Sequence, residues 1–277
     1  RNHGYMVYDT LFALDEEYNI KPQMAEGYTV SDDGLTYTIT LRDGLTFHDG
    51  ADVTAEDVIA SLKRWGERDG MGQKLMTQIA SWEAPDAKTV VITLAEPYGL
   101  LMDSIAKPSS NVPFIMPKRL AETPSTEGVP EQIGSGPFKF VQDEFQPGVI
   151  TVYEKFEEYV PRDEPPSWAS GGKVAKVDRV VWIVMSDAQT AMNAIMSGEI
   201  DYWEAPPYDL LPVLETVPDL TIHVINKMGS TTIGRFNFLN PPFDDVKVRQ
   251  AAMIAMNQQD VMDAMIGNPD YYQICGA

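Results

Sequence analysis

Three histidines, His3, His48 and His223, are the side chains best suited to act as a general base near neutral pH. None lies in a motif that also supplies a nucleophile, and the sequence contains no Gly-x-Ser-x-Gly elbow. The Gly-Ser-Gly run at 134–136 leads into a strand-like segment, so it predicts a tight turn and not a phosphate loop. His48, beside Asp49-Gly50, is expected to be a turn residue with a locally bonded imidazole; a ligand role is the alternative. We therefore predict no catalytic residues.

The remaining polar side chains do not favour a metal site. No two His or Cys residues stand at the spacing of zinc ligands. Carboxylates cluster at 15–17, 157–158 and 163–164. Adjacent residues on an exposed segment point apart, which favours solvated surface over a calcium site or an acid pair. The 14 methionines fall at core spacings, such as 192 with 196 and 253 with 256, which favours packing over copper or haem ligation. We expect neither a metal nor a cofactor.

Alternating and helical patterns predict the elements that must hold these residues. Residues 35–41 alternate apolar side chains with threonine between two Asp-Gly pairs, which predicts a half-buried strand between tight turns. Thr54 and Asp57 form a capping pattern for a helix with an apolar stripe, which Gly66 should end. Further strand patterns lie at 45–47, 89–94, 138–142, 149–154, 177–185 and 221–226.

Helical patterns dominate the last third of the chain. Helices are predicted after caps at Ser186 or Asp187, at Asp209, at Asp245 and at Asn257, and Gly198 should end the first of them. Two Pro-rich loops precede these helices: 123–134 could join two subdomains, and 161–172 is expected to be a surface excursion. The order of elements is irregular, which supports neither a barrel nor a doubly wound sheet. We predict an α/β protein with mixed sheets and more than one substructure.

Length and charge narrow the class of protein. At 277 residues, with 21 Lys and Arg against 41 Asp and Glu, the chain carries a formal charge of −20 and has the size of about two domains. Nucleic acid and anionic membrane surfaces are therefore poor candidate partners. No apolar run approaches the roughly 20 residues of a membrane helix. The first residues carry no signal-peptide pattern, so we expect that any targeting segment has been removed.

Two segments could line a ligand pocket. Large rings flank a rigid corner in Tyr202-Trp203-Glu204-Ala205-Pro206-Pro207-Tyr208, and Trp65 precedes a Gly-rich loop at 66–72. Either segment could line a ligand pocket, but for each residue taken singly the sequence favours partial burial in a core.

Two stretches of the sequence carry specific motifs. The first runs from Pro22 through Ala25-Glu26-Gly27-Tyr28, the segment DDGLTYTITLRDG at 32–44 and Phe47-His48-Asp49-Gly50 to Thr54-Ala55-Glu56-Asp57-Val58. The second is Asn240-Pro-Pro-Phe-Asp-Asp-Val-Lys-Val-Arg249-Gln250-Ala251, leading into Ala255-Met256-Asn257. In this order and at this spacing the sequence resembles the family 5 extracellular solute-binding proteins, the peptide, oligopeptide and nickel type that serve ABC importers. The resemblance covers essentially the whole chain.

The resemblance implies a two-lobed, periplasmic-binding-protein-like clamshell of the class with an extra inserted subdomain. Because the family's proteins are nearly twice as long, the chain would cover mainly lobe 1. Residues 1–20 and 134–238 would form the core subdomain of lobe 1, 21–133 the inserted subdomain, and 239–277 the start of lobe 2. The single cysteine, Cys275, resembles the first of a pair found in lobe 2 of some relatives, which suits an oxidising periplasm.

The resemblance also implies where a ligand would bind. In the family, lobe 1 meets its ligand through the segment before the first helix, the loops after the first long helix and after the Glu-Pro strand, and the hinge. Carried onto this sequence, these segments give Asn2, His3, Tyr5, Met71, Gly72, Ser109, Ser110, Asn111, Arg235 and Asn237. Trp203 is added on chemical grounds, as a large ring beside a Pro-Pro corner.

We therefore predict the periplasmic substrate-binding component of an ABC importer. It would be a monomer that captures a peptide-like or other small organic solute between two lobes and delivers it to the membrane permease. Closure would be a population shift, because a ligand that touches both lobes favours the closed state. Two alternatives stay open: a periplasmic hydrolase of peptides or glycosides that uses His48 or spatially assembled carboxylates, and a chaperone-like or sensory interaction protein on the same fold.

Overall fold

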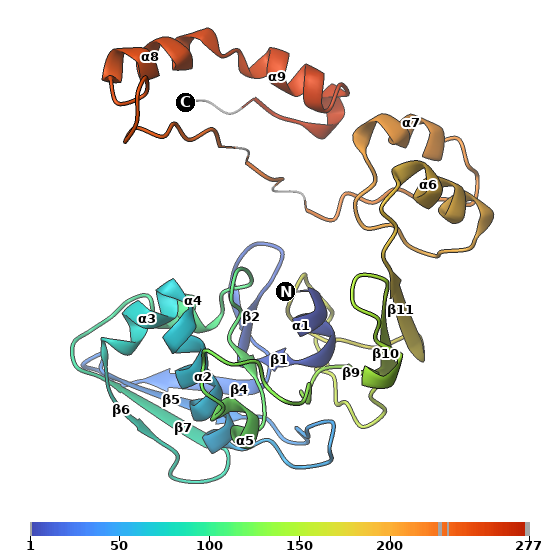
Figure 1. Ribbon diagram of the computed structural model, residues 1–277. Helices are drawn as coiled ribbons and strands as arrows, with labels where there is room; N and C mark the ends of the chain where they lie inside the picture. Colours follow the sequence, from blue (N-terminus) through green and yellow to red (C-terminus); the bar gives the residue numbers. More distant parts are fainter. Residues whose placement is uncertain (1, 227–228, 232, 275–277) are drawn as a thin grey trace. The chain divides into compact units, whose positions relative to one another are not determined.

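The computed structural model describes residues 2–226, 229–231 and 233–274, coloured along the sequence in Figure 1. The chain divides into two compact units, residues 1–184 (unit 1) and 185–277 (unit 2). Each unit has a hydrophobic cluster of its own. The predicted boundaries at residues 20, 133 and 238 divide the chain differently and stay a prediction, and Cys275 lies outside the described residues.

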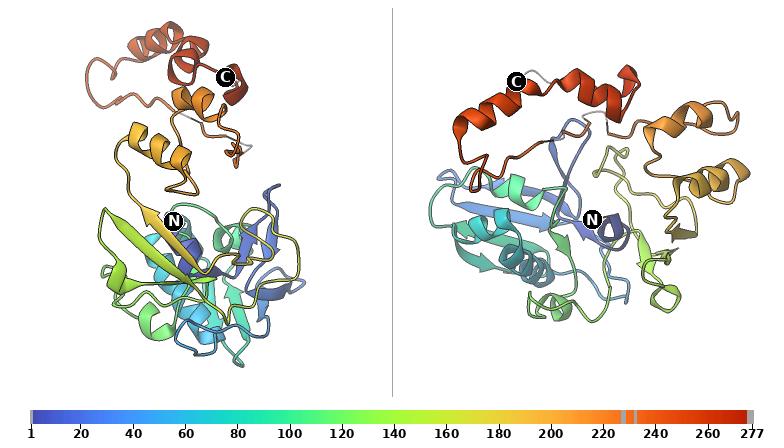
Figure 2. Two further views of the ribbon diagram at one scale, coloured as in Figure 1. Left: turned by 90° about the vertical axis from the view of Figure 1, so that its right-hand side faces the viewer. Right: turned by 45° about the horizontal axis from the view of Figure 1, so that its top comes forward.

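The larger core of unit 1 lies between an antiparallel sheet and helices. The strand order is β4-β5-β7-β6, with β4 at Ala25–Val30, β5 at Thr36–Leu41, β6 at Ile79–Glu83 and β7 at Thr89–Leu94. The helices are α2 at Ala55–Arg68, α3 at Gly70–Met76, α4 at Leu101–Ile105 and α5 at Lys118–Ala121. Helix α2 packs on one face of this sheet (Figures 1 and 2), where its Val58, Leu62 and Trp65 are buried with Ile39 and Ile92. The strand predicted at 35–41 and the apolar stripe of the helix are confirmed.

The two ends of α2 show which local sequence signals are enough to predict a helix boundary. Thr54 forms the predicted capping box: its hydroxyl accepts from the Asp57 N–H, and the Asp57 carboxylate accepts from the Thr54 N–H. The predicted end at Gly66 is wrong, because the helix continues to Arg68. A Cβ on Gly66 would lie 2.6 Å from Cγ of Met76, so this glycine serves the close packing of α3 instead of ending the helix.

A second, smaller sheet packs against the first helix. Strands β9 at Phe138–Phe140, β10 at Ile150–Lys155 and β11 at Arg179–Ile183 form an antiparallel sheet in the order β11-β10-β9. Their side chains bury Tyr153 with Val7 and Tyr8 at the end of α1, which spans Asn2–Val7. Two short pairings complete unit 1: β1 at Asp9–Thr10 with β8 at Phe114–Ile115, and β2 at Phe12–Leu14 with β3 at Ile20–Pro22.

The Pro-rich loop 161–172 is only partly the expected surface excursion. Residues 163–166, which hold its acidic residues and two of its prolines, are exposed, but its end, Ser170 to Gly172, is buried. The N–H of Ala169 donates to the Leu14 carbonyl at 3.2 Å, and the side chain of Gln23 donates to the Gly171 carbonyl at 3.4 Å. The loop therefore lies beside the β2–β3 hairpin, as both views of Figure 2 show.

Unit 2 is helical in the part of the chain that the structure describes. Helix α6 (Ala188–Ser197) begins at the cap Asp187 and ends at Gly198, whose φ of 73° is the left-handed conformation that glycine adopts freely. The remaining helices are η2 at Tyr208–Leu210, α7 at Leu211–Leu214, α8 at Val246–Ala255, α9 at Gln258–Met265 and η3 at Pro269–Tyr271. The caps at Asp187, Asp245 and Asn257 are confirmed.

Several other predictions about the elements are wrong. Residues 45–47 and 221–226 form no strand, because neither segment pairs with another strand. Their single β-bridge joins Thr46 to Asp52. Asp209 lies inside the 3₁₀ helix η2 instead of capping a helix. Met253 and Met256 are 63% and 56% exposed, because α8 buries none of its residues. In α6, Met192 packs in the core as expected, but Met196 is 43% exposed. Among the described residues, no helix is both long and apolar enough to cross a membrane.

Candidate functional site

The start of α1 carries three predicted ligand residues, Asn2, His3 and Tyr5. The His3 ring lies on the aromatic cluster of the second sheet: its Nδ1 is 2.9 Å from the Tyr153 hydroxyl, and its edge meets Phe140 at a centroid distance of 5.3 Å. Burial lowers the pKa of His3, although a hydrogen bond with the Gln132 side chain works to raise it. The Tyr5 hydroxyl donates to the Pro108 carbonyl at 3.2 Å, which links α1 to a loop that is distant in sequence.

The first turn of α3, directly after α2, holds Met71 and Gly72. Asp69 caps α3, because its Oδ1 accepts from the N–H groups of Met71 at 2.9 Å and Gly72 at 3.0 Å. Gly72 is required here for space: a Cβ would lie 2.9 Å from the Cα of Gly66 and 3.1 Å from the Trp65 ring. The turn is therefore fixed in position on the end of α2.

The loop at 107–111 carries the exposed residues Ser109, Ser110 and Asn111. Lys107 Nζ donates to Oδ2 of Asp69 at 2.6 Å, and the Trp65 indole N–H donates to the Asn111 carbonyl at 2.7 Å. Both oxygens of Asp69 are thus bonded. Burial works to raise the pKa of its carboxyl, but the hydrogen bonds from Lys107 and the backbone hold that pKa below its usual value.

The predicted segments of unit 1 therefore form one connected neighbourhood. Tyr5 reaches the 107–111 loop, and this loop reaches Asp69 through Lys107 and Trp65 of α2 through the Asn111 carbonyl. Sequence reasoning selected Tyr5 and Trp65 but missed Asp69 and Lys107. Asp69 had a usable signal, since an Asp directly before a Gly-Met-Gly turn is typical of a helix cap; Lys107 had none, because its partner is distant in sequence.

Three predicted residues, Trp203, Arg235 and Asn237, belong to unit 2. Trp203 is half-buried against the cluster of Met192, Leu211 and Leu214, which fits the alternative of partial core burial. Arg235 and Asn237 are exposed, and the Asn237 side chain accepts locally from the Leu239 N–H at 3.3 Å.

His48 is a bonded turn residue, as expected, but its partners are not local. Its Nδ1 accepts from the Gly134 N–H at 3.3 Å, so the ring proton is on Nε2, which donates to the Gly136 carbonyl at 3.0 Å. Burial is the main reason that its pKa falls to about 4. Residues 135–137 form a bend that leads into β9. A Cβ on Gly134 would lie 2.1 Å from the Val7 carbonyl oxygen.

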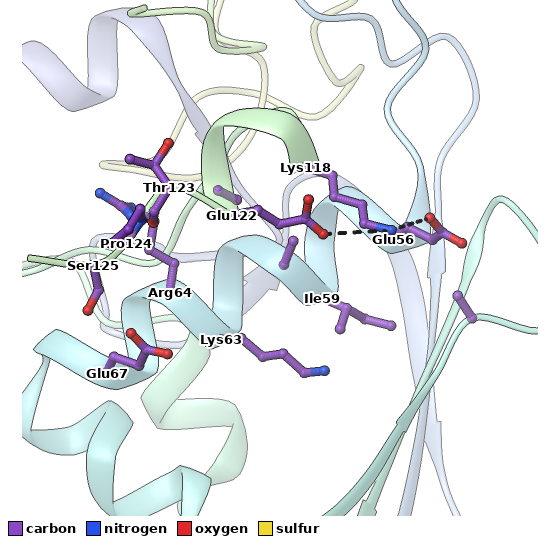
Figure 3. Close-up of a pocket in the computed structure, with 13 residues that line it drawn as sticks. Glu56, Ile59, Lys63, Arg64, Glu67, Lys118, Glu122, Thr123, Pro124 and Ser125 are labelled. Carbon is purple, nitrogen blue, oxygen red and sulfur yellow. Dashed lines mark hydrogen bonds and ion pairs between the residues drawn. The ribbon is translucent and has the colours of Figure 1, made fainter. Parts of the chain in front are cut away.

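A separate groove of about 530 Å³ lies between α2 and α5 (Figure 3). It is lined by Glu56, Ile59, Ala60, Lys63, Arg64, Glu67, Ala84, Lys118, Ala121, Glu122, Thr123, Pro124 and Ser125. Most of its cations already have partners: Lys118 contacts Glu56 at 2.9 Å and Glu122 at 3.9 Å, and Arg64 donates to the carbonyls of Thr123 and Glu127. No predicted ligand residue lines this groove. Across the described ranges, no group of three or more His, Cys, Asp or Glu could hold a metal ion.

Comparison with known proteins decides the family. The family model of the bacterial extracellular solute-binding proteins, family 5 Middle, matches residues 19–272. The chain belongs to this family. The solute-binding protein is also 44% identical, over 99% of its length and 51% of the relative's, to a probable peptide ABC transporter periplasmic-binding protein, y4tO, of Sinorhizobium fredii (strain NBRC 101917 / NGR234). It is 34% identical to the glutathione-binding protein GsiB of Salmonella typhi, over 91% of this chain and 46% of that protein.

Solved structures agree on the fold of this solute-binding protein. The oligopeptide-binding protein AppA of Bacillus subtilis, in complex with a nonapeptide, matches 95% of this chain and 51% of its own, with a TM-score of 0.71 and 26% identity. The periplasmic binding protein DppA of Helicobacter pylori, in complex with the peptide STSA, matches 94% of this chain and 52% of its own, with a TM-score of 0.73 and 24% identity. The chain thus has the mixed α/β fold of periplasmic binding proteins and spans about half the length of the curated relatives it matches.

Proposed function

We propose that the protein is the substrate-binding component of an ABC importer. It captures a small organic solute, peptide-like in the first instance, outside the cytoplasm and delivers it to the membrane permease. The observation that carries this proposal is the match of the family 5 model to residues 19–272, together with a relative at 44% identity named as a probable peptide transporter component.

The connected neighbourhood of unit 1 supports the proposal as half of a binding site. It offers the aromatic rings of His3 and Tyr5, the thioether of Met71, and the hydroxyl and amide groups of Ser109, Ser110 and Asn111. Such a set suits a solute with apolar side chains and a polar backbone, since binding sites combine mostly apolar walls with a few orienting polar groups. In the proposal Trp203, Arg235 and Asn237 add further contacts, and the lobes close around the solute by a population shift.

The proposed organisation assigns residues 1–20 and 134–238 to the core subdomain of lobe 1, 21–133 to the inserted subdomain, and 239–277 to the start of lobe 2. A protein with this division acts as a monomer, because each molecule provides both walls of its own cleft. The folded core and the charge of −20 support a role in solution and not on nucleic acid.

The test is calorimetric titration of the full-length protein with a panel of dipeptides, tripeptides, glutathione, opines, sugars and metal chelates. We expect saturable binding of at least one peptide-like compound. Ser109→Ala and Met71→Ala should weaken it, whereas Lys63→Ala in the groove beside α2 should leave it unchanged. A protein that binds none of these compounds, and whose deletion leaves their uptake intact, would refute the proposal.

The hydrolase alternative depends on His48 or on assembled carboxylates. Both ring nitrogens of His48 are engaged by backbone groups of Gly134 and Gly136, which leaves neither nitrogen for a substrate. Turnover of a peptide or glycoside by the full-length protein, abolished in His48→Ala, would favour the hydrolase. Binding of a protein partner without a small solute would favour the interaction-protein alternative.

A further inference from the structure

An exposed loop tip in unit 1 adopts a backbone conformation that its residue disfavours. Ser110 has a φ of 61°, in the left-handed region, although it is not a glycine. An L-residue avoids this region because its Cβ crowds the neighbouring carbonyl group. Such a conformation persists only where the surrounding structure fixes it, and it is concentrated at functional sites.

The loop is held on both sides of Ser110. On the N-terminal side, Lys107 bonds to Asp69 at 2.6 Å and the Pro108 carbonyl accepts from the Tyr5 hydroxyl at 3.2 Å. On the C-terminal side, the carbonyl of Asn111 accepts from the Trp65 indole N–H at 2.7 Å. Between these anchors Ser109 and Ser110 are exposed to solvent.

The ion pair is the most buried of these anchors. The side chain of Asp69 is 4% exposed and that of Lys107 is 17% exposed, so water screens their attraction only weakly. Asp69 also holds the N–H groups of Met71 and Gly72 through its other oxygen. One carboxylate therefore fixes two segments, 70–72 and 107–111, relative to each other.

We propose that the Asp69–Lys107 ion pair positions the solute-binding face of unit 1 by holding the 107–111 loop with Ser110 in the left-handed conformation. Asp69 and Lys107 are positioning residues that touch no solute. They keep the hydroxyls of Ser109 and Ser110 beside Met71 and Gly72, ready to bind the polar backbone of a peptide-like solute. This inference rests on the proposed function, because it assumes that these segments contact the solute.

The first test needs no solute and uses amide hydrogen exchange in the full-length protein. Lys107→Met keeps the aliphatic stem and removes the charge, so we expect exchange at residues 70–72 and 109–111 to rise at least about tenfold. Lys155→Met removes a cation from the exposed pair with Glu157, at 2.8 Å, and should leave exchange in both segments unchanged. Lys107→Arg keeps the charge and should stay near the wild type. Should Lys107→Met fail to fold, Asp69→Asn serves in its place. Unchanged exchange in a folded variant would overturn the proposal.

The second test measures the affinity for glutathione and for the dipeptide Met-Leu. If only about a tenth of the Lys107→Met molecules keep the native loop conformation, the dissociation constant of this variant should be about tenfold higher than that of the wild type. Ser110→Gly removes the penalty for the left-handed conformation, so the effect of Lys107→Met should shrink to about twofold in the Ser110→Gly background. Ser109→Gly is the matched control and should give no such rescue. A general loss of stability would predict equal effects in both glycine backgrounds.

The outcomes separate this inference from the proposed function. Raised exchange with unchanged affinity for either peptide that the wild type binds would overturn the positioning role while leaving the proposed function intact. A wild-type protein that binds no member of the panel would overturn the proposed function and the positioning role together. Raised exchange, weaker binding and rescue only by Ser110→Gly would support both.

Discussion

His48 should make the folded protein progressively less stable as the pH falls below 6.5. Burial is the main cause that lowers the pKa of its imidazole from 6.5 to about 4, since a charged ring would lose its hydration. The hydrogen bond from Nε2 to the Gly136 carbonyl works to raise this pKa but is outweighed by burial. At the other nitrogen, Nδ1 accepts from the Gly134 N–H at 3.3 Å. A proton on Nδ1 would remove this acceptor and place two N–H groups against each other.

The size of the effect follows from the two pKa values. Between pH 6.5 and about 4, the unfolded chain binds a proton that the folded chain does not, so the free energy of unfolding decreases as the pH falls. At about 1.4 kcal/mol for each pH unit, this interval corresponds to about 3 kcal/mol. The contribution of His48 is complete above pH 6.5 and is lost by about pH 4.

Urea unfolding of the wild type and of His48→Gln, followed by tryptophan fluorescence between pH 7.5 and 4, measures this contribution. Glutamine can still donate to the Gly136 carbonyl but does not titrate, and carboxylates common to both proteins cancel in the difference. We expect the wild type to lose about 3 kcal/mol more than His48→Gln across this range. A difference that stays constant with pH, or a His48 proton resonance that titrates near 6.5, would refute the reasoning.

Three further substitutions test the packing and the polar contacts, each by chemical denaturation of the chain. Gly134→Ala places a Cβ 2.1 Å from the Val7 carbonyl oxygen and should cost about 3 kcal/mol, whereas Gly27→Ala, with open space around its Cβ, should not destabilise the chain. Thr54→Ala removes the capping box of α2 and should cost about 1 kcal/mol; no change in the midpoint would count against it. Lys173→Met leaves Asp9, which is 0% exposed, without its cation and should cost about 3 kcal/mol or more, against less than about 1 kcal/mol for Lys155→Met.

The parts of the fold that the sequence predicts correctly depend on few neighbours. A capping box needs only Thr54 and Asp57, and a helix that ends in glycine needs only the left-handed conformation of Gly198. The strand at 36–41 follows from alternation between two turns, and its pairing with β7 confirms it. Gly66 illustrates the limit, because its role is set by Met76, which packs against it from another helix.

The candidate site was predictable as segments but not as an arrangement. Motif resemblance selected Asn2, His3 and Tyr5 with residues 71–72 and 109–111, and contacts within unit 1 join these segments. The contacts that join them cross 38 to 103 positions of the sequence, and no local pattern encodes such a pairing. Ligand contact remains a prediction for all of the selected residues, including Trp203, Arg235 and Asn237.

Buried polar contacts join segments of unit 1 that are distant in sequence. His48 reaches Gly134 and Gly136, and Asp9 accepts from Lys173 at 2.7 Å and from the Tyr159 hydroxyl at 2.9 Å. The ion pairs of Asp9 and Asp69 contribute little net stability, because desolvation of the charges offsets most of their attraction. These polar contacts do fix the relative positions of the groups they join, and a binding surface that is already ordered loses less conformational entropy when a solute binds. Geometry therefore accounts better than stability for the burial of Asp9 and Asp69 in this unit.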